Sequence, residues 1–337
     1  MGKVALLIGI ASYRFGLNPL PAAWKNVEVL KRALQKAQPS FDAIHCLRDR
    51  YAPQIIQEAI ERFAEQRQPE DFLLLFFSGY GIQDADGKLY FATPITANDD
   101  RGSLIKARTI PASFIQEVLN SSPTQQQLVI LDCYFHPALS EPADDTTEPP
   151  TATHSSVDVL SQLGGKNRLI LTADSAIQAI AEPEDLDTWS YTRYLAEGLV
   201  TGAADANYDG RLTIAELHEY ARRKLQIAAP AMQPALYGSE AIAQHHLYQI
   251  SQANAALKYR QFVEKLASVD RVDALGSRLL VARHVMDNFR YHLGLSPQSA
   301  DQIEFEVLRP VREYRQRLQL YQELFSRLAQ GHHDSQP

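Results

Sequence analysis

Two uninterrupted apolar runs constrain the fold of this chain more than any other feature of its sequence. Residues 72–77 read Phe-Leu-Leu-Leu-Phe-Phe, and Lys3–Ile10 is apolar after its first residue apart from Gly9. A strand with one face in water alternates apolar and polar residues, whereas a strand covered on both faces is apolar throughout. The runs therefore predict strands buried on both faces, as in the parallel sheets of α/β proteins.

Helix-like and strand-like segments alternate around these runs. Apolar residues recur at helical spacing in Ala22–Ala37, Ala52–Gln66, Ile110–Asn120 and Thr192–Leu199. Further strands are predicted at Ala43–Leu47, Leu89–Thr93, Gln127–Cys133 and Arg168–Thr172. Strands that alternate with helices predict an α/β fold with a mostly parallel sheet covered on both faces.

An acidic segment interrupts this alternation. Residues 140–165 hold Glu141, Asp144, Asp145, Glu148 and Asp158, with almost no large apolar side chain before Val157. Such a composition buries too little apolar surface to offset the conformational entropy lost on ordering. We expect a mobile acidic loop here.

The pattern becomes entirely helical after about residue 250. Helices are predicted at Ala255–Ala267, Leu275–His292, Pro297–Leu308 and Val311–Ala329. Ser296 and Pro297 form a good helix start, with serine as the N-cap and proline at the first helical position. We therefore expect two domains, residues 1–250 and residues 251–337.

Composition excludes several classes of function. The chain has 337 residues and a formal net charge of −7, so it lacks the basic surface that nucleic-acid binding requires. Its two cysteines, Cys46 and Cys133, give no disulfide framework and fit a reducing compartment. No apolar stretch approaches the ~20 residues of a membrane-spanning helix. We expect a cytoplasmic protein without nucleic-acid or membrane partners.

Two motifs follow predicted strands and should meet at one edge of the sheet, where the carboxyl ends of parallel strands lie. Ser78–Gly81 reads Ser-Gly-Tyr-Gly, and Asp132–Phe135 reads Asp-Cys-Tyr-Phe. They resemble the Ser-Gly-His-Gly and Asp-Cys-Cys-x-Ser-Gly motifs of bacterial caspase homologues, the orthocaspases, and of metacaspases. Leu7–Ile10 and Leu20–Ala23 also match the first strand and loop of that family.

The resemblance extends over about residues 3–225 and implies a caspase-like fold of the peptidase C14 family. That fold is a mostly parallel six-stranded sheet flanked by helices, here followed by a small all-α module. The family consists of cysteine endopeptidases, whose chemistry needs a thiol nucleophile, a histidine that takes its proton, and donors for the oxyanion.

The chain departs from the family at both catalytic positions. Tyr80 stands at the position of the histidine and Tyr134 at that of the cysteine. A phenol with a reference pKa of about 10 is a poor base or nucleophile at neutral pH. Cys133 precedes the nucleophile position and should face the opposite side of its strand, in the core. We therefore predict a catalytically inactive pseudoenzyme that acts as a regulatory, decoy or scaffold protein in bacterial signalling.

Two other functions stay open from the sequence. One is a weak or unconventional hydrolase that uses Tyr134 or Cys133. The other is a calcium-responsive adaptor without any connection to proteolysis.

The substrate pocket that the resemblance implies is incomplete. Family members bind a basic residue with acidic side chains, of which Asp132 is kept, while Asn26 replaces the second acid. Ser78, also a pocket position, remains. Asp132 could instead cap a helix or loop. The chain also has no Lys or Arg between Arg108 and Lys166, the interval in which active relatives often cut themselves.

Residues 205–216 match the twelve-residue EF-hand loop at every position. The oxygen ligands would be Asp205, Asn207, Asp209, the Arg211 carbonyl, Thr213 and Glu216. Gly210 stands at the sharp turn of this pattern. The sequence predicts a Ca²⁺ site, and the alternative is a loop that only caps the following helix. We expect no other cofactor.

The helical tail also resembles a known type of module. Gly294–Pro297, Ile303–Leu308, Tyr314 and Tyr321 are similar to a helical region that follows bacterial caspase-like and other signalling domains. We interpret residues 251–337 as an adaptor or oligomerisation module that binds protein partners, among them active caspase homologues or their targets. The alternative is structural support for the sheet domain.

Overall fold

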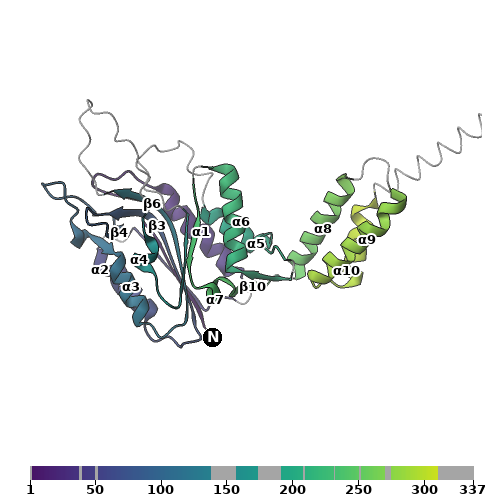
Figure 1. Ribbon diagram of the computed structural model, residues 1–337, viewed down its shortest axis with the longest axis horizontal. Coiled ribbons are helices and arrows are strands. Elements are labelled where there is room, and N and C mark those ends of the chain that lie inside the picture. The colour runs from purple at the N-terminus through teal and green to yellow at the C-terminus, as the bar shows by residue number, and fades with distance from the viewer. Residues whose placement is uncertain are drawn as a thin grey trace, which may run out of the picture. The chain divides into compact units, whose positions relative to one another are not determined.

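The computed structural model in Figure 1 describes residues 2–37, 40–49, 52–137, 157–173, 191–207, 209–230, 232–249, 252–269 and 275–309. The chain divides into two compact units. The first comprises Met1–Ala206 and Arg211–Gln249, and the second comprises Asn207–Gly210 and Ile250–Pro337. Each unit is described by itself.

A mainly parallel sheet forms the centre of the first unit. Its main path runs in the order β2-β1-β3-β6-β7-β9. These strands are β1 (Lys3–Gly9), β2 (Ala43–Arg48), β3 (Phe72–Gln83), β6 (Gln126–Pro137), β7 (Arg168–Thr172) and β9 (Ala235–Gly238). The first five strands of this path are parallel, and β9 pairs with β7 antiparallel. The prediction of a mostly parallel α/β sheet is confirmed.

Two short strands extend the sheet beside the end of β3. They are β4 (Leu89–Ala92), which pairs antiparallel with β3, and β5 (Thr109–Pro111), which pairs antiparallel with β4. A 3-10 turn, η1 (Lys106–Arg108), leads into β5.

Helices cover both faces of the sheet, as the buried apolar strands require (Figure 1). Helices α2 (Pro53–Ala64), α3 (Ala112–Ser121) and α4 (Val159–Leu163) share one core with alternate residues of the strands, such as Leu6, Leu75 and Val129. A second group of helices in this unit consists of α1 (Pro21–Gln35), α5 (Tyr191–Thr201) and α6 (Ile214–Ala228). Within this group, α5 packs against both α1 and α6. Burial of one Leu, Ile or Phe side chain stabilises a fold by about 1.5–3 kcal/mol.

Two predictions about the strand ends and the acidic loop are wrong. β3 continues to Gln83 and β6 to Pro137, beyond the ends expected at Ser78 and Cys133, because the two strands pair with each other throughout and β4 adds to β3. The loop expected to reach residue 165 ends earlier, since Val159 and Leu163 are buried and Asp158 caps α4 by accepting from Ser161 N at 3.0 Å. Residues 140–156 lie outside the described residues.

Smaller elements complete the first unit. Strands β8 (Arg211–Thr213) and β10 (His246–Gln249) form a separate antiparallel pair, and α7 (Glu240–Ala243) precedes β10. The sequence analysis did not predict β8, β9, β10 or α7, which are only three or four residues long.

The second unit is helical. It contains α8 (Gln252–Val269), α9 (Leu275–His292) and α10 (Pro297–Val307). Its buried side chains include Tyr259, Val263, Leu295 and Ile303. The predicted N-cap is confirmed, because Ser296 Oγ accepts from Ser299 N at 3.2 Å. The helix predicted at Val311–Ala329 lies outside the described residues. Over the residues that the structure describes, no helix combines the length and the apolar character needed to cross a membrane.

A buried arginine ties one end of the sheet to the helices beside it. The side chain of Arg168, in β7, is only 1% exposed. Its Nε donates to Gln127 Oε1 at 3.0 Å, and its Nη2 donates to Asn120 Oδ1 at 2.9 Å. Its Nη1 donates to the carbonyl oxygens of Leu163 and Gly164. Burial lowers the pKa of Arg168 to about 10. Four neutral acceptors thus solvate this charge in place of water.

Replacement of Arg168 should therefore destabilise the fold strongly. We expect Arg168→Met to lower the free energy of unfolding by about 2–4 kcal/mol, because four acceptors lose their donor and two of these bonds are fully buried. Urea denaturation measures the loss. Arg32→Gln is the control, since Arg32 is 73% exposed and pairs with Glu28 on the surface of α1; it should cost less than about 0.5 kcal/mol. Equal losses in the two variants would contradict this role of Arg168.

Candidate functional site

The extended pairing of β3 and β6 places two tyrosines side by side. Tyr80 and Tyr134 are direct partners in the register of the two strands. Their ring centroids lie 6.3 Å apart, and the ring planes are inclined by 56°. Tyr80 is 5% exposed, and Tyr134 is half-buried. The structure thus brings together the two positions that the sequence analysis assigned to the catalytic pair.

A third tyrosine closes this aromatic cluster. The ring centroid of Tyr13 lies 5.1 Å from that of Tyr80, with the planes 62° apart. Tyr13 Oη donates to the Ile10 carbonyl at 2.9 Å and accepts from Tyr80 N at 3.2 Å. A Cβ atom at Gly79 would lie 2.8 Å from Tyr13 Oη, so only glycine leaves room for this hydroxyl. Burial raises the pKa of Tyr13 well above its ordinary value, which keeps the phenol protonated.

Cys133 lies on the other face of β6, as predicted. Its side chain is 5% exposed and belongs to the core that α2 and α3 cover, whereas Tyr134 packs with the Tyr80 cluster. Its Sγ donates to the Phe77 carbonyl at 3.7 Å. Burial raises the pKa of the Cys133 thiol well above its ordinary value, and the Asp132 carboxylate raises it further. A buried protonated thiol is inert as a nucleophile.

The three pocket positions also come together. Asn26 Nδ2, on α1, donates to Asp132 Oδ2 at 3.1 Å and to Ser78 Oγ at 3.3 Å. The same oxygen of Asp132 accepts from Thr192 N at 3.3 Å and from Thr192 Oγ1. Thr192 is the second residue of α5, so the carboxylate of Asp132 caps that helix. The alternative role that the sequence analysis left open for Asp132 is thus present in the structure.

The start of α5 is held in place by a second buried bond. Tyr191 Oη and His218 Nδ1, on α6, lie 2.6 Å apart, and both side chains are buried. Burial lowers the pKa of His218 to about 4, so the ring is neutral at pH 7. This bond joins α5 to α6. It holds the start of α5 next to Thr192, the residue that donates to the Asp132 carboxylate.

Cations surround the aromatic side chains near this cluster. Arg48 lies over the Trp24 ring at 4.7 Å, and Lys106 over the Tyr90 ring at 5.5 Å. Trp24 and Tyr90 pack in the same cluster as Tyr80 and Tyr134. Such cation–π contacts contribute about 0.5–1 kcal/mol at exposed sites. Both cations also pair with carboxylates, Arg48 with Asp49 at 3.8 Å and Lys106 with Asp84 at 2.8 Å.

Comparison with known proteins agrees with this arrangement. Residues 2–253 match the family model of the caspase domain, Peptidase C14. The chain belongs to the caspase domain family. Among curated proteins none matches the chain significantly.

A solved structure is also similar to this chain. The crystal structure of protein GSU0716 from Geobacter sulfurreducens aligns with a TM-score of 0.47 and 12% sequence identity. The alignment covers 74% of this chain and all of that one.

Two residues of the site were missed by the sequence analysis. Tyr13 lies in a loop 67 positions before Tyr80, and Thr192 is 60 positions after Asp132. Local sequence carries no signal for the Tyr13 contact. For Thr192 the indication was its place at the start of the helix predicted at Thr192–Leu199, because threonine is common near helix starts.

Glu216, the last predicted ligand of the EF-hand-like loop, is part of a helix cap in the caspase domain. Glu216 Oε2 accepts from Thr213 N at 3.0 Å and from Thr213 Oγ1 at 2.8 Å. In return, Glu216 N donates to Thr213 Oγ1 at 3.2 Å, which completes a capping box at the start of α6. Glu216 Oε1 accepts from Ala206 N at 3.2 Å. Both carboxylate oxygens are thus engaged.

The other loop residues divide between the two units. Asp205 is 2% exposed and belongs with Arg211, Thr213 and Glu216 to the first unit. In the second unit, Asn207 Oδ1 accepts from Asp209 N at 2.9 Å, and Gly210 adopts a φ of 78°, as the sharp turn requires. Over the described residues, no three His, Cys, Asp or Glu side chains are placed to hold a metal. The donor types suit calcium, and calcium would have to draw Glu216 from its cap.

The engaged Asp132 carboxylate leads to a prediction about Asn26. Asn26→Asp should lower the free energy of unfolding by about 1–3 kcal/mol at pH 7, because it removes a donor and sets two carboxylates against each other. Repulsion raises the pKa of one carboxyl above its unfolded value, so the loss should shrink as the pH falls towards 4. Asn26→Ala removes the donor without adding charge, so its loss should depend on pH less steeply than that of Asn26→Asp. Chemical denaturation at several pH values measures the free energy of unfolding of both variants. Stability losses that change in parallel with pH would contradict the prediction.

Calcium binding stays a prediction, which the capping box makes testable. Glutamine can keep the capping box at this position but cannot supply the bidentate carboxylate that calcium needs. Calcium should raise the melting temperature of the wild type, through about 2.7 kcal/mol of stabilisation at a hundredfold excess over Kd, and should leave Glu216→Gln unchanged. Magnesium should substitute poorly. Equal shifts in both proteins, or none, would show that the loop is a helix connector only.

Proposed function

We propose that this caspase-domain protein does not cleave peptide bonds and acts by binding other proteins, as a regulator, decoy or scaffold in bacterial signalling. The observation that carries the proposal is the Tyr80–Tyr134 pair at the register position where the family resemblance places the histidine and the cysteine. Two phenols cannot form the thiolate and imidazolium that cysteine peptidase chemistry uses.

The neighbourhood of the pair supports the same conclusion. Cys133 is the nearest thiol in sequence, but it faces the core and its pKa is raised by burial. The carboxylate of Asp132 already accepts bonds from Asn26 and Thr192. A basic substrate side chain would have to displace these partners, which costs free energy before any is gained.

We further propose that the helical unit takes part in partner binding. Its helices α8 and α10 enclose a core of their own, and Tyr259 donates to Glu304 across them. A unit with its own core can present a surface without support from the sheet. Active caspase homologues and their targets are the partners proposed for residues 251–337.

Peptidase assays test the central claim. We expect no turnover of fluorogenic peptides that end in Arg, Lys or Asp, with or without calcium, above the level of Tyr134→Phe. This control removes only the phenol oxygen, so folding and aromatic packing should be kept. An iodoacetamide probe should label Cys133 only after unfolding, because the thiol is buried.

Two results would contradict the proposal. Turnover that Tyr134→Phe abolishes would favour the alternative of an unconventional hydrolase. Labelling of Cys133 in the folded protein, together with turnover lost in Cys133→Ala, would favour a thiol peptidase instead.

A further inference from the structure

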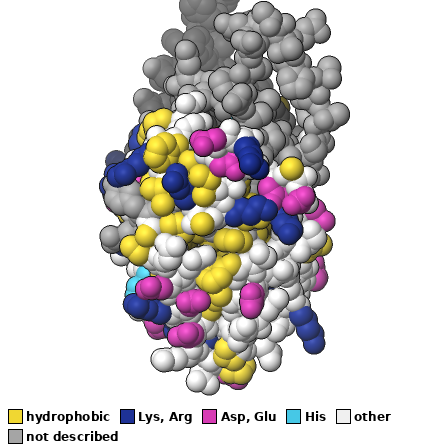
Figure 2. Space-filling model, turned by 90° about the vertical axis from the view of Figure 1, so that its left-hand side faces the viewer, with side chains coloured by type: hydrophobic (Ala, Val, Ile, Leu, Met, Phe, Trp, Pro, Cys, Tyr) yellow, Lys and Arg dark blue, Asp and Glu magenta, His cyan; other side chains and the backbone are white. Residues whose placement is uncertain are grey.

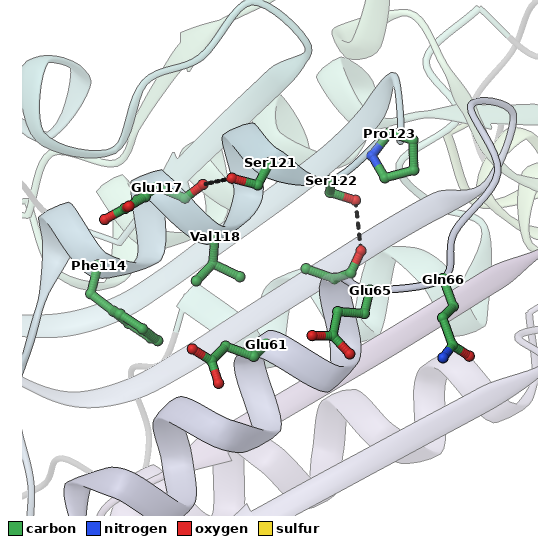
Figure 3. A pocket seen from close by; sticks show the side chains of 10 residues that line it. Glu61, Glu65, Gln66, Phe114, Glu117, Val118, Ser121, Ser122 and Pro123 are labelled. Carbon is green, nitrogen blue, oxygen red and sulfur yellow. Dashed lines mark hydrogen bonds between the residues drawn. The ribbon is translucent and has the colours of Figure 1, made fainter.

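A groove lies between α2 and α3, on elements separate from the tyrosine cluster. It encloses a volume of about 470 Å³ between the C-terminal half of α2 and the outer face of α3 (Figure 3). Phe114 and Val118, one helical turn apart on α3, form its apolar floor. Glu61, on α2, Glu65, which follows the last residue of α2, and Glu117, on α3, form its acidic rim. We call this feature the α2–α3 groove.

The floor is partly uncovered apolar surface. Phe114 and Val118 are half-buried and pack on the main core from outside. Figure 2 faces this side of the molecule and shows hydrophobic side chains that run between acidic ones in its lower half. Covering such surface contributes about 25 cal/mol per Å². A ligand with a large apolar side chain would therefore gain from entering the groove.

Three carboxylates concentrate negative charge at the rim. Glu61 lies in the last turn of α2 and Glu65 directly follows that helix, and in Figure 3 both carboxylates lie on the side that faces α3. Like charges that lie close together repel each other. In the described part of the chain, neither these two residues nor Glu117 has an ion pair.

Another acidic residue of α2, Glu58, does form an ion pair. Glu58 pairs with Arg62 at i+4, with 3.5 Å between the carboxylate and the guanidinium. On α1, Glu28 pairs in the same way with Arg32 at 2.9 Å. Of the two glutamates in α2, Glu61, the one at the groove, has no ion pair within the described part of the chain. A cation that binds at the groove would relieve the repulsion of the rim carboxylates and gain their attraction.

The groove is formed before any ligand arrives. At its end, Ser122 Oγ donates to the Ala64 carbonyl at 2.9 Å and joins the end of α3 to the end of α2 (Figure 3). Ser121 Oγ donates to the Glu117 carbonyl at 2.9 Å and closes the last turn of α3. A preformed surface loses little conformational entropy on binding.

We propose that the α2–α3 groove binds a cationic segment of a partner protein in which Lys or Arg side chains flank a large apolar residue. The apolar residue contacts Phe114 and Val118, and the cations lie between Glu61, Glu65 and Glu117. This pattern is that of an amphipathic helix laid into a groove. The proposal does not depend on the absence of peptidase activity.

A labelled synthetic peptide with Lys and Leu at helical spacing is the probe, and fluorescence anisotropy at physiological ionic strength measures its affinity. The triple variant Glu61→Gln, Glu65→Gln, Glu117→Gln should bind it at least about tenfold more weakly than the wild type. The matched control, Glu28→Gln, Glu58→Gln, Glu240→Gln, changes the net charge equally and should bind within about twofold of the wild type. A peptide of the same composition in scrambled order should bind both proteins weakly.

Other results would overturn the proposal. Equal losses in the two triple variants would show that the peptide follows net charge, and unchanged binding by the groove variant would exclude the groove. Circular dichroism and melting curves establish that each variant folds, and the groove variant should melt no lower than the wild type because repulsion is removed. If the wild-type chain alone forms a dimer that the groove variant loses, the occupant is a second copy and not a cationic partner.

Discussion

The parallel pairing of β3 with β6 positions the candidate site and the core of the first unit. It runs without interruption from Phe72 beside Gln126 to Gln83 beside Pro137. Because side chains alternate along a strand, this register assigns every residue of both motifs to a face. Tyr134 comes to lie beside Tyr80, and Cys133 turns to the core under α2 and α3. A shift of one residue would exchange them.

Buried polar groups complete the frame that this pairing begins. The guanidinium of Arg168 donates hydrogen bonds to four neutral acceptors. The carboxylate of Asp132 accepts hydrogen bonds from Asn26 and from the start of α5. Removal of one partner of such a hydrogen bond lowers the free energy of unfolding, because the other polar group stays buried without a bond. The position that would receive a substrate cation in the family therefore serves here to hold a helix.

Electrostatics separates two surfaces of the first unit. Arg48 and Lys106 lie over aromatic rings that pack in the tyrosine cluster, while Glu61, Glu65 and Glu117 line the α2–α3 groove. Complementary charge governs the choice of partner more than the strength of binding.

The sequence by itself determined the α/β class, the strands at the apolar runs, the nature of the residues at the two catalytic positions, and the inward face of Cys133. Those features depend on local periodicity and on residue identity, which a linear pattern carries. The packing of whole elements decided that β3 and β6 run on past their motifs, that Asp132 caps α5, and that three glutamates border one groove. Each of these depends on contacts between distant segments, as between Asp132 and Thr192, 60 positions apart. Residue spacing along a chain does not encode such distances, because they arise only when whole elements pack.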